Sequence, residues 1–323
     1  IRYSLSIALL LRTLRAKPFY FTGLRAKERS MTHSNVHNAD ILVIGGTGNV
    51  GTPLVDLLKA KQASFKVLVR STENQAKLAA QDIDTVLGAL GDWDSIEAAL
   101  VGVETVFLLS SPEMDFLALH TGLIDRAVAA GVRKIVRMSS QPAQTNPEVP
   151  MYDMHIKADH YLEQSGLDFA ILRPDYFMQN MENMHAPYIK EHNMFAQYLG
   201  DARIPMVDAR DIAKAALHCL LSDDFNGQTH YITGPRSISF YDVADAFSGA
   251  LDRQINYVAL SEDAQIEGLK SAGVPDPVVA GVMAVFNGWV DAKERLPQSD
   301  FEKITGTKAI DIEQHAQDFA SAF

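Results

Sequence analysis

The stretch "DILVIGGTGNVGTPLVDLLKA", residues 40–60, decides the fold of this chain. A run of aliphatic residues leads into a glycine-rich turn, and apolar residues at helical spacing follow. Four glycines stand in the turn: Gly45, Gly46, Gly48 and Gly51. The order strand, tight turn and helix predicts the first unit of a parallel sheet with a phosphate-binding loop.

Three of these glycines follow the spacing G-x-x-G-x-x-G, and each has a physical task. Gly45 permits the turn, Gly48 lets the main chain approach a pyrophosphate, and Gly51 lets the helix lie close to the strand. We expect the helix to begin near Asn49 and to direct free N–H groups at that anion. The alternative is a turn that needs glycines for its own shape. The predicted dinucleotide-binding residues are Gly45, Thr47, Gly48, Asn49, Val50 and Gly51.

From residue 40 onward, short apolar runs alternate with helical patterns. The runs are "ILVI", "FKVLV", "DTVL", "TVFLL", "KIVRM" and "FAILR". Runs that are apolar on both faces, each followed by an amphipathic helix, predict an α/β fold with a doubly wound parallel sheet of the Rossmann type. This alternation stops after Pro174.

The later parts of the chain are expected to build a substrate lobe. Residues 40–235 form the NAD(P)-binding Rossmann domain, and its Met-, Asn- and aromatic-rich segment 176–205 contributes to the lobe. Residues 236–323 form the rest of this smaller, mostly helical lobe, with "INYV" as a short strand. Between the two segments, "RIPMV" is expected to be a strand that leads into a helix.

Composition excludes several classes of function. The net charge of −11 repels phosphate backbones, so direct nucleic-acid binding is disfavoured. No apolar run reaches the roughly 18 residues of a membrane span. The single cysteine, Cys219, permits no intrachain disulfide, which favours a reducing, cytoplasmic location. No group of His, Asp and Glu has metal-ligand spacing, so no metal is expected.

The first residues differ from the rest. Residues 1–30 carry seven Lys or Arg side chains against one Glu. We exclude the basic leader, residues 1–39, from the fold and expect it to be disordered or a targeting segment. A mitochondrial location is the alternative if this leader is genuine, and an upstream extension foreign to the native protein is the other interpretation.

The end of the second strand selects the cofactor. An NAD site usually has Asp or Glu there to hold the ribose 2′-hydroxyl, whereas "KVLVRST" has Arg70. A guanidinium attracts the 2′-phosphate of NADP, so we expect NADP(H), with NAD(H) the less favoured alternative. Topology places Asp92 beside the adenine after the third strand. After the fourth strand it places Ser110, Ser111 and Pro112 beside the nicotinamide.

Two further segments carry a family resemblance: "EQSGLDFAILRPDYFMQN" and "IPMVDARDIAKAA". Together with the "GGTGNVG" loop, they resemble the NmrA-like family of atypical short-chain dehydrogenases/reductases. The resemblance is close over residues 40–235 and loose in the C-terminal lobe. It implies an NAD(P)H-dependent reductase of quinones, dyes or phenylpropanoids, or a redox-sensing regulator that binds the dinucleotide without turnover.

The usual catalytic pair of short-chain dehydrogenases is missing, because none of the ten tyrosines has Lys four places later. By the resemblance, His155 falls where phenylpropanoid reductases carry a catalytic Lys and where quinone-reductase-like members tend to carry His. With a pKa near about 6.5 it can donate a proton, and Asp159, one turn later, can orient it. The alternative is that His155 caps its helix or packs under a loop.

A substrate pocket is expected beyond the strand that ends at Arg173. The predicted substrate residues are Tyr152, Tyr176, Phe177 and Asn180, with Asn180 as the polar point of an apolar, aromatic-accepting wall. A plain core helix explains the aromatic residues equally well.

The leading hypothesis is an NADPH-dependent oxidoreductase that transfers hydride to a small electron-poor acceptor such as a quinone, enone, imine or dye. A quinone needs little acid help, so the missing Tyr is tolerable. The binding partner is then a small-molecule acceptor. The alternative is a non-catalytic NADP(H)-sensing regulator that acts through a protein partner.

Overall fold

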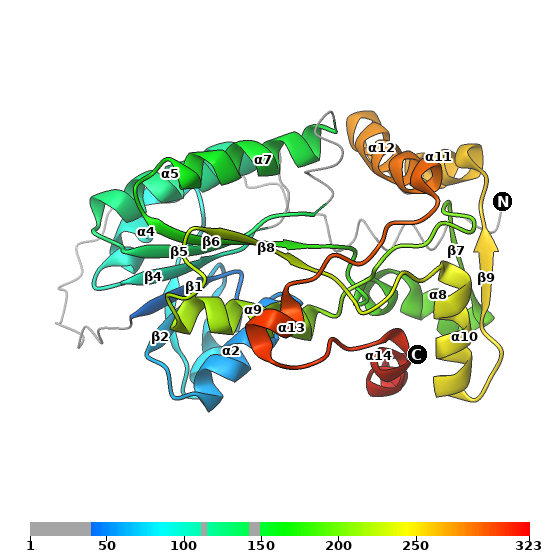
Figure 1. Cartoon of the computed structure of the whole chain (residues 1–323), viewed down its shortest axis with the longest axis horizontal. Helices are drawn as coiled ribbons and strands as arrows, with labels where there is room; N and C mark the ends of the chain where they lie inside the picture. The colour runs from blue at the N-terminus through cyan, green and yellow to red at the C-terminus, as the bar shows by residue number, and fades with distance from the viewer. Residues whose placement is uncertain (1–39, 111–114, 142–148) are drawn as a thin grey trace.

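A computed structural model of the chain describes residues 40–110, 115–141 and 149–323, so the basic leader lies outside the described residues. A seven-stranded parallel sheet forms the centre, in the strand order β3-β2-β1-β4-β5-β6-β8 (Figure 1). The strands are β1 (Ile41–Ile44), β2 (Phe65–Val69), β3 (Asp84–Leu87), β4 (Thr105–Leu108), β5 (Lys134–Met138), β6 (Asp168–Pro174) and β8 (Gln228–Ile232). The predicted doubly wound Rossmann sheet is confirmed.

Helices cover both faces of the sheet (Figure 1). One face carries α2 (Gly51–Ala60), α3 (Thr72–Ala79), α9 (Ala209–Leu221) and α13 (Phe301–Thr305); the other carries α4 (Trp93–Leu100), α5 (Phe116–Ala129) and α7 (Pro150–Glu163). The strands alternate between the two cores: Val43 and Phe107 pack toward α2 and α9, whereas Leu42 and Val106 pack toward α4 and α5. This explains why the strand sequences are apolar at consecutive positions.

A second lobe has its own apolar core at one end of the sheet (Figure 1). Its elements are η1 (Met181–His185), α8 (Ala186–His192), β7 (Met194–Gln197), α10 (Phe240–Leu251), β9 (Asn256–Ala259), α11 (Glu262–Ser271), α12 (Asp276–Ala292), α14 (Ile312–Asp318) and η2 (Ala320–Ala322). The parallel pair β7 and β9 joins the segment after β6 to the C-terminal part of the chain. The predicted strand "INYV" overlaps β9.

Two parts of the backbone differ from the expectation. The segment "RIPMV" belongs to neither sheet and makes isolated bridges, Arg203 to Glu294 and Ile204 to Ile238. Pro205 has no N–H for a strand ladder, and the segment crosses between the sheet and the lobe. Strand β8, with the sequence "QTHYI", was not predicted; it is an edge strand whose residues alternate between exposed or half-buried and buried.

Buried ionic contacts fasten the lobe to the sheet. Asp175, directly after β6, forms an ion pair of 3.0 Å with Arg295. The imidazole of His315 on α14 contacts Asp208 at the start of α9 (2.8 Å) and Glu182 in η1 (3.0 Å). Burial opposes a charge on His315, but the two carboxylates outweigh it and raise its pKa. Among the described residues, no helix is both long and apolar enough to cross a membrane.

Candidate active site

The glycine loop lies between β1 and β4, where the strand order reverses. Gly45 has a φ of +84°, and a Cβ there would lie 2.6 Å from the carbonyl oxygen of Leu109, which follows β4. A Cβ on Gly51 would overlap the carbonyl oxygen of Gly45. Both positions therefore need glycine so that the loop and α2 can close against the sheet. Ligands of doubly wound sheets bind at this reversal.

Gly48 differs from its neighbours in the loop. Its φ is not positive, and the nearest protein atom to a Cβ there would be the Gly45 carbonyl oxygen at 3.5 Å, an ordinary contact. Thr47, Gly48 and Asn49 are exposed, whereas the Val50 side chain is buried in the core. The fold itself does not require a glycine at position 48. The absence of a side chain there fits the close approach of a diphosphate to the main chain.

The start of α2 leaves donors for that anion. The helix begins at Gly51, two residues after the predicted start. Val50 precedes it and has no side-chain oxygen that could cap the helix. The Thr52 amide donates to the Gly48 carbonyl (2.9 Å) and Pro53 has no N–H, so the amides of Asn49, Val50 and Gly51 are the ones for which the described residues supply no acceptor. The residues present thus suit a dinucleotide.

Arg70 and Asp92 lie at neighbouring strand ends. Arg70 is exposed directly after β2, and the hydroxyl of Ser71 accepts a hydrogen bond from the Asn74 amide as the N-cap of α3 (3.2 Å). Asp92 is exposed at the start of α4, and its side chain makes no capping hydrogen bond. Arg70 is thus the basic side chain at the place where an adenosine 2′-phosphate would lie.

A buried hydrogen-bond relay reaches Ser110 from the sheet. The Nε of Arg137 on β5 donates to the Nδ1 of His120 on α5 (3.2 Å), and the Nε2 of His120 lies 2.9 Å from the Ser110 hydroxyl. A guanidinium only donates, so Nδ1 accepts and the ring proton is on Nε2. Burial, followed by the charges of Arg137 and His155, lowers the pKa of His120 well below its usual range. The relay therefore holds the Ser110 hydroxyl with a neutral donor, the His120 imidazole. The other two residues predicted beside the nicotinamide, Ser111 and Pro112, lie outside the described residues.

Asp159 belongs to a buried ionic cluster and does not orient His155 as expected. Its carboxylate pairs with Arg137, with Arg173 at 2.8 Å and with the hydroxyl of Ser139 at 2.8 Å. Arg137 and Asp159 expose no side-chain surface to solvent. Both oxygens of Asp159 are engaged by side chains of β5 and β6, which outcompete a neighbour on its own helix.

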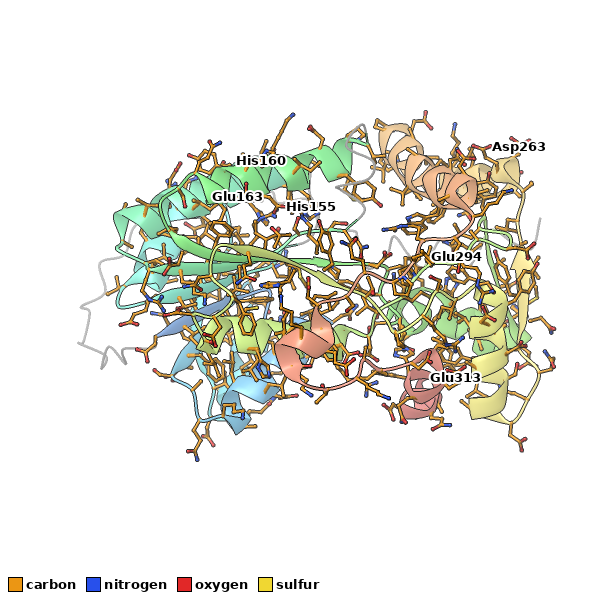
Figure 2. The ribbon with its side chains drawn as sticks, viewed as in Figure 1. His155, His160, Glu163, Asp263, Glu294 and Glu313 are labelled. Atoms are coloured by element: carbon orange, nitrogen blue, oxygen red, sulfur yellow. The ribbon has the colours of Figure 1, made fainter. Side chains whose placement is uncertain are left out.

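His155 lies on the side of α7 that faces the sheet, whereas His160 lies on the outer side (Figure 2). Its ring packs 4.6 Å from the ring of Phe116, and among the described residues its buried Nδ1 has no hydrogen-bond partner. Burial, helped by the charges of Arg137 and Arg173, lowers the pKa of His155 to about 3. The expected pKa near 6.5 is thus wrong. At neutral pH the imidazole can donate a hydrogen bond but carries no proton to give up as an imidazolium.

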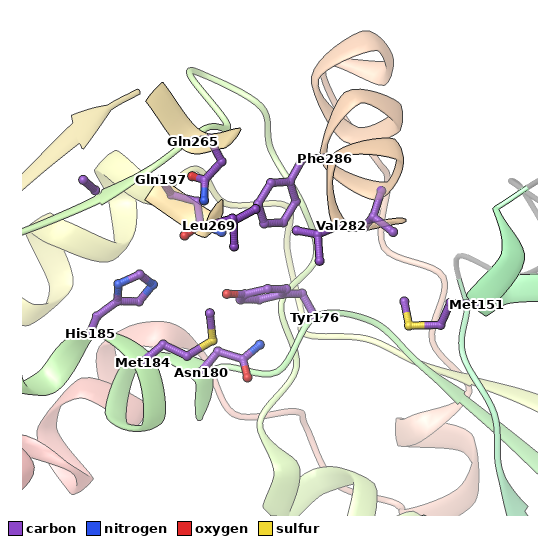
Figure 3. A pocket seen from close by; sticks show the side chains of 12 residues that line it. Met151, Tyr176, Asn180, Met184, His185, Gln197, Gln265, Leu269, Val282 and Phe286 are labelled. Atoms are coloured by element: carbon purple, nitrogen blue, oxygen red, sulfur yellow. The ribbon is translucent and has the colours of Figure 1, made fainter. Parts of the chain in front are cut away.

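A cavity of about 240 Å³ opens in the second lobe, on the side where β6 ends and α7 begins (Figure 3). Its lining residues are Met151, Tyr176, Asn180, Met184, His185, Ala196, Gln197, Gln265, Leu269, Val282, Val285 and Phe286. They come from α7, the segment after β6, η1, β7, α11 and α12. Three separate stretches of the chain, at residue 151, within 176–197 and within 265–286, thus line one largely apolar space.

The predicted substrate residues divide between this cavity and the cores. Tyr176 and Asn180 line the cavity. Phe177 pairs through its backbone with Val207 and packs against the core under the sheet, because the chain directs it opposite to Tyr176. Tyr152 is buried in the core of the second lobe, and its neighbour Met151 lines the cavity instead. Among the described residues no group of His, Cys, Asp and Glu could hold a metal ion.

The sequence did not predict the relay from Arg137 through His120 to Ser110, nor the place of His185 in the cavity wall. Arg137 carried a signal, since it is a charged residue inside the apolar run "KIVRM". His120 and His185 carried none, because their neighbours come from other segments of the chain.

Comparisons with known proteins agree with this geometry. Residues 37–316 match the model of the NmrA-like family. An NAD(P)H azoreductase of Xenophilus azovorans is 30% identical over 88% of this chain and 99% of its own length. Quinone oxidoreductase 2 of Escherichia coli is 32% identical over 73% of this chain and 83% of its own length. The structure of an NADPH-dependent quinone oxidoreductase of Escherichia coli with NADPH superposes with a TM-score of 0.76, at 26% identity, over 87% of this chain and 99% of that chain.

Proposed function

The chain belongs to the NmrA-like family, and we propose that it is an NAD(P)H-dependent reductase that transfers hydride to a small electron-poor acceptor such as a quinone or a dye. NADPH is the favoured coenzyme. Exposed Arg70 at the end of β2 supports this choice, as does the NADPH complex of the related quinone oxidoreductase.

One observation carries the proposal: an apolar cavity lies at the same edge of the sheet as the glycine loop. Tyr176 stands two residues after β6, and Met151 stands one turn before His155 on α7. An acceptor in this cavity would therefore approach a nicotinamide that lies beside Ser110. A loop that merely needed glycines would require no such cavity.

When bound, NADPH supplies the hydride. The contribution of the chain is chiefly orientation, which can lower a barrier by several kcal/mol when reacting atoms are held at near-attack distance. We assign to Ser110, fixed by His120, the positioning of the nicotinamide end. His155 offers a neutral ring N–H as a hydrogen-bond donor to the acceptor, in place of the proton donor expected from its ordinary pKa.

Stopped-flow mixing tests the proposal. NADPH-loaded protein is mixed with a panel of quinones and dyes, and the loss of NADPH absorbance is followed against a protein-free control. We expect oxidation far above the control rate with at least one neutral quinone. Oxidation at the control rate with every acceptor would leave the non-catalytic sensor as the better interpretation.

We also propose a cellular location for the protein and a division of the chain into two functional parts. A buried lone cysteine, Cys219, suits a reducing compartment such as the cytoplasm. We propose that 40–235, with 176–205 shared, binds the coenzyme and that 236–323 completes the acceptor site. Fluorescence microscopy of the full chain with and without residues 1–39 would test the mitochondrial alternative.

A further inference from the structure

His185 closes one end of the cavity with an unsatisfied imidazole. It is the last residue of η1 and is 3% exposed, and it lies opposite Met151 with Tyr176 between them (Figure 3). Among the described residues, neither ring nitrogen has a hydrogen-bond partner. A buried donor without a partner is costly, so a position like this one calls for a ligand that completes it.

The hydroxyl of Tyr176 is a second donor in the same space. It is buried and forms no hydrogen bond of normal geometry, although the Asn180 amide lies near enough to oppose the rise of its pKa that burial causes. A phenol with a raised pKa stays protonated and neutral. The cavity therefore contains two neutral groups that can donate to a ligand.

The position of His185 is fixed from behind. Its ring packs 5.3 Å from that of Phe195, and Glu182, also in the π-helix η1, contacts His315 at 3.0 Å. Met184 and His185 line the cavity while Glu182 is held by α14. Short π-helical segments such as η1 are frequent at functional sites.

The walls select against charge. None of the described residues that line the cavity is Asp, Glu, Lys or Arg. A sulfonate or a cationic dye would lose its hydration there without gaining a counter-charge. The volume of about 240 Å³ lies below the roughly 300–1,000 Å³ of pockets for drug-sized ligands, so one or two rings fit.

We propose that His185, with the Tyr176 hydroxyl, binds the end of the acceptor that lies away from the nicotinamide. The acceptor is then a neutral one- or two-ring molecule with a hydrogen-bond-accepting atom at that distal end, as in a para-quinone whose second carbonyl meets His185. This inference rests on the proposed function and names its substrate class.

The test compares His185→Leu, His185→Gln and the matched control His192→Leu, which changes an exposed histidine of α8. With menadione as the acceptor, His185→Leu should raise KM about tenfold, the loss of one hydrogen bond, with kcat within about twofold and NADPH affinity unchanged. His185→Gln keeps an amide donor and should recover most of the loss. The control should behave like the wild type.

Two further readouts separate recognition from a structural role. The melting temperature of His185→Leu should not fall, because leucine leaves no unsatisfied donor; a structural histidine would lower it. The wild type should reduce a naphthoquinone sulfonate and malachite green far less efficiently than menadione. An unchanged menadione KM in His185→Leu, or equal efficiency with the charged acceptors, would overturn the inference.

Calorimetric titration of menadione into the NADP⁺-loaded protein measures acceptor binding without turnover. It therefore tests the role of His185 even if the protein proves not to be a reductase. If the wild type oxidises no NADPH, the reductase proposal fails, yet His185→Leu should still weaken menadione binding about tenfold. Equal menadione affinity in the two proteins, or no binding to either, would refute the role of His185 by itself.

Discussion

The Cα of Gly51 lies against the carbonyl oxygen of Gly45, which leaves no room for a methyl group, whereas Gly48 in the same loop has an open side. The two positions are therefore glycine for different reasons. Gly51 is required by the fold, because α2 could not otherwise close on β1. The fold leaves room for a side chain at Gly48, so we propose that this position is glycine because a ligand approaches it.

Gly48→Ala and Gly51→Ala should accordingly separate binding from folding. Gly48→Ala should change the free energy of unfolding by no more than about 0.5 kcal/mol and weaken NADPH binding at least about tenfold. Gly51→Ala should destabilise the fold by several kcal/mol, on the order expected for a backbone clash. Urea unfolding and NADPH fluorescence titration measure the two quantities. Full NADPH affinity in Gly48→Ala would contradict the diphosphate site.

Arg70→Glu should reverse the coenzyme preference. Removing the cation and adding a carboxylate beside the 2′-phosphate should cost about 2 kcal/mol or more, roughly thirtyfold in the NADPH Kd, and leave the NADH Kd little changed. Lys77→Glu on α3 makes the same charge change at an exposed position nearby and serves as the control. Equal losses for NADPH and NADH by calorimetry would refute the role of Arg70.

The ionic cluster predicts unequal losses from its members. Asp159→Asn leaves Arg137 and Arg173 facing each other without a counter-charge and should cost about 3–5 kcal/mol of stability. Arg137→Met leaves the pair Asp159–Arg173 intact and should cost less, on the order of 1–2 kcal/mol. Chemical denaturation at neutral pH measures both, and a larger loss in Arg137→Met would speak against the cluster as described.

His155→Ala should lower turnover while NADPH affinity stays the same. Loss of one hydrogen bond to the acceptor should reduce kcat/KM about tenfold. Because the pKa of His155 is lowered to about 3, its imidazole is neutral throughout the ordinary assay range. The pH profile of kcat should thus lack a step near 6.5, and a step that disappears in His155→Ala would show that the residue titrates there after all.

Acid should destabilise the protein through its buried neutral histidines. Burial lowers the pKa of His185 to about 4, so between about 4 and 6.5 the unfolded chain binds a proton there that the native state does not. Stability from this group is full above about 6.5 and falls as pH drops toward 4. Denaturation between about pH 5 and 6 should show a slope that is smaller in His185→Leu by about one proton, near 1.4 kcal/mol per pH unit.

The sheet was largely predictable because its evidence is local. Six apolar runs, with helical patterns between them, predict β1 to β6. The carboxyl ends of these parallel strands meet at one edge of the sheet. Strand β8 was not predicted because it is an edge strand that buries only His230 and Ile232, so its sequence lacks an apolar run. The segment "RIPMV" was wrongly predicted as a strand. An apolar run indicates that its residues are buried but not whether they pair with a neighbouring strand, and here they form only isolated bridges.

The site was predictable only where sequence neighbours make it. Tyr176 and Asn180 follow β6 directly, so their place at the cavity could be expected. The partners of Asp159 could not be, since Arg137 and Arg173 lie 22 and 14 residues away. The environment that lowers the pKa of His155 is likewise made by β5, β6 and α5, and no spacing along α7 encodes it.

The contact of His315 with Glu182 spans 133 residues and bears on how the protein is made. The glycine loop and β4 leave the ribosome before the segment that presents His185, and α14, which braces that segment, leaves after both. Chains fold from the N-terminal side during synthesis. A nascent polypeptide can thus form the glycine loop before α14 is available to brace the wall of the cavity that contains His185.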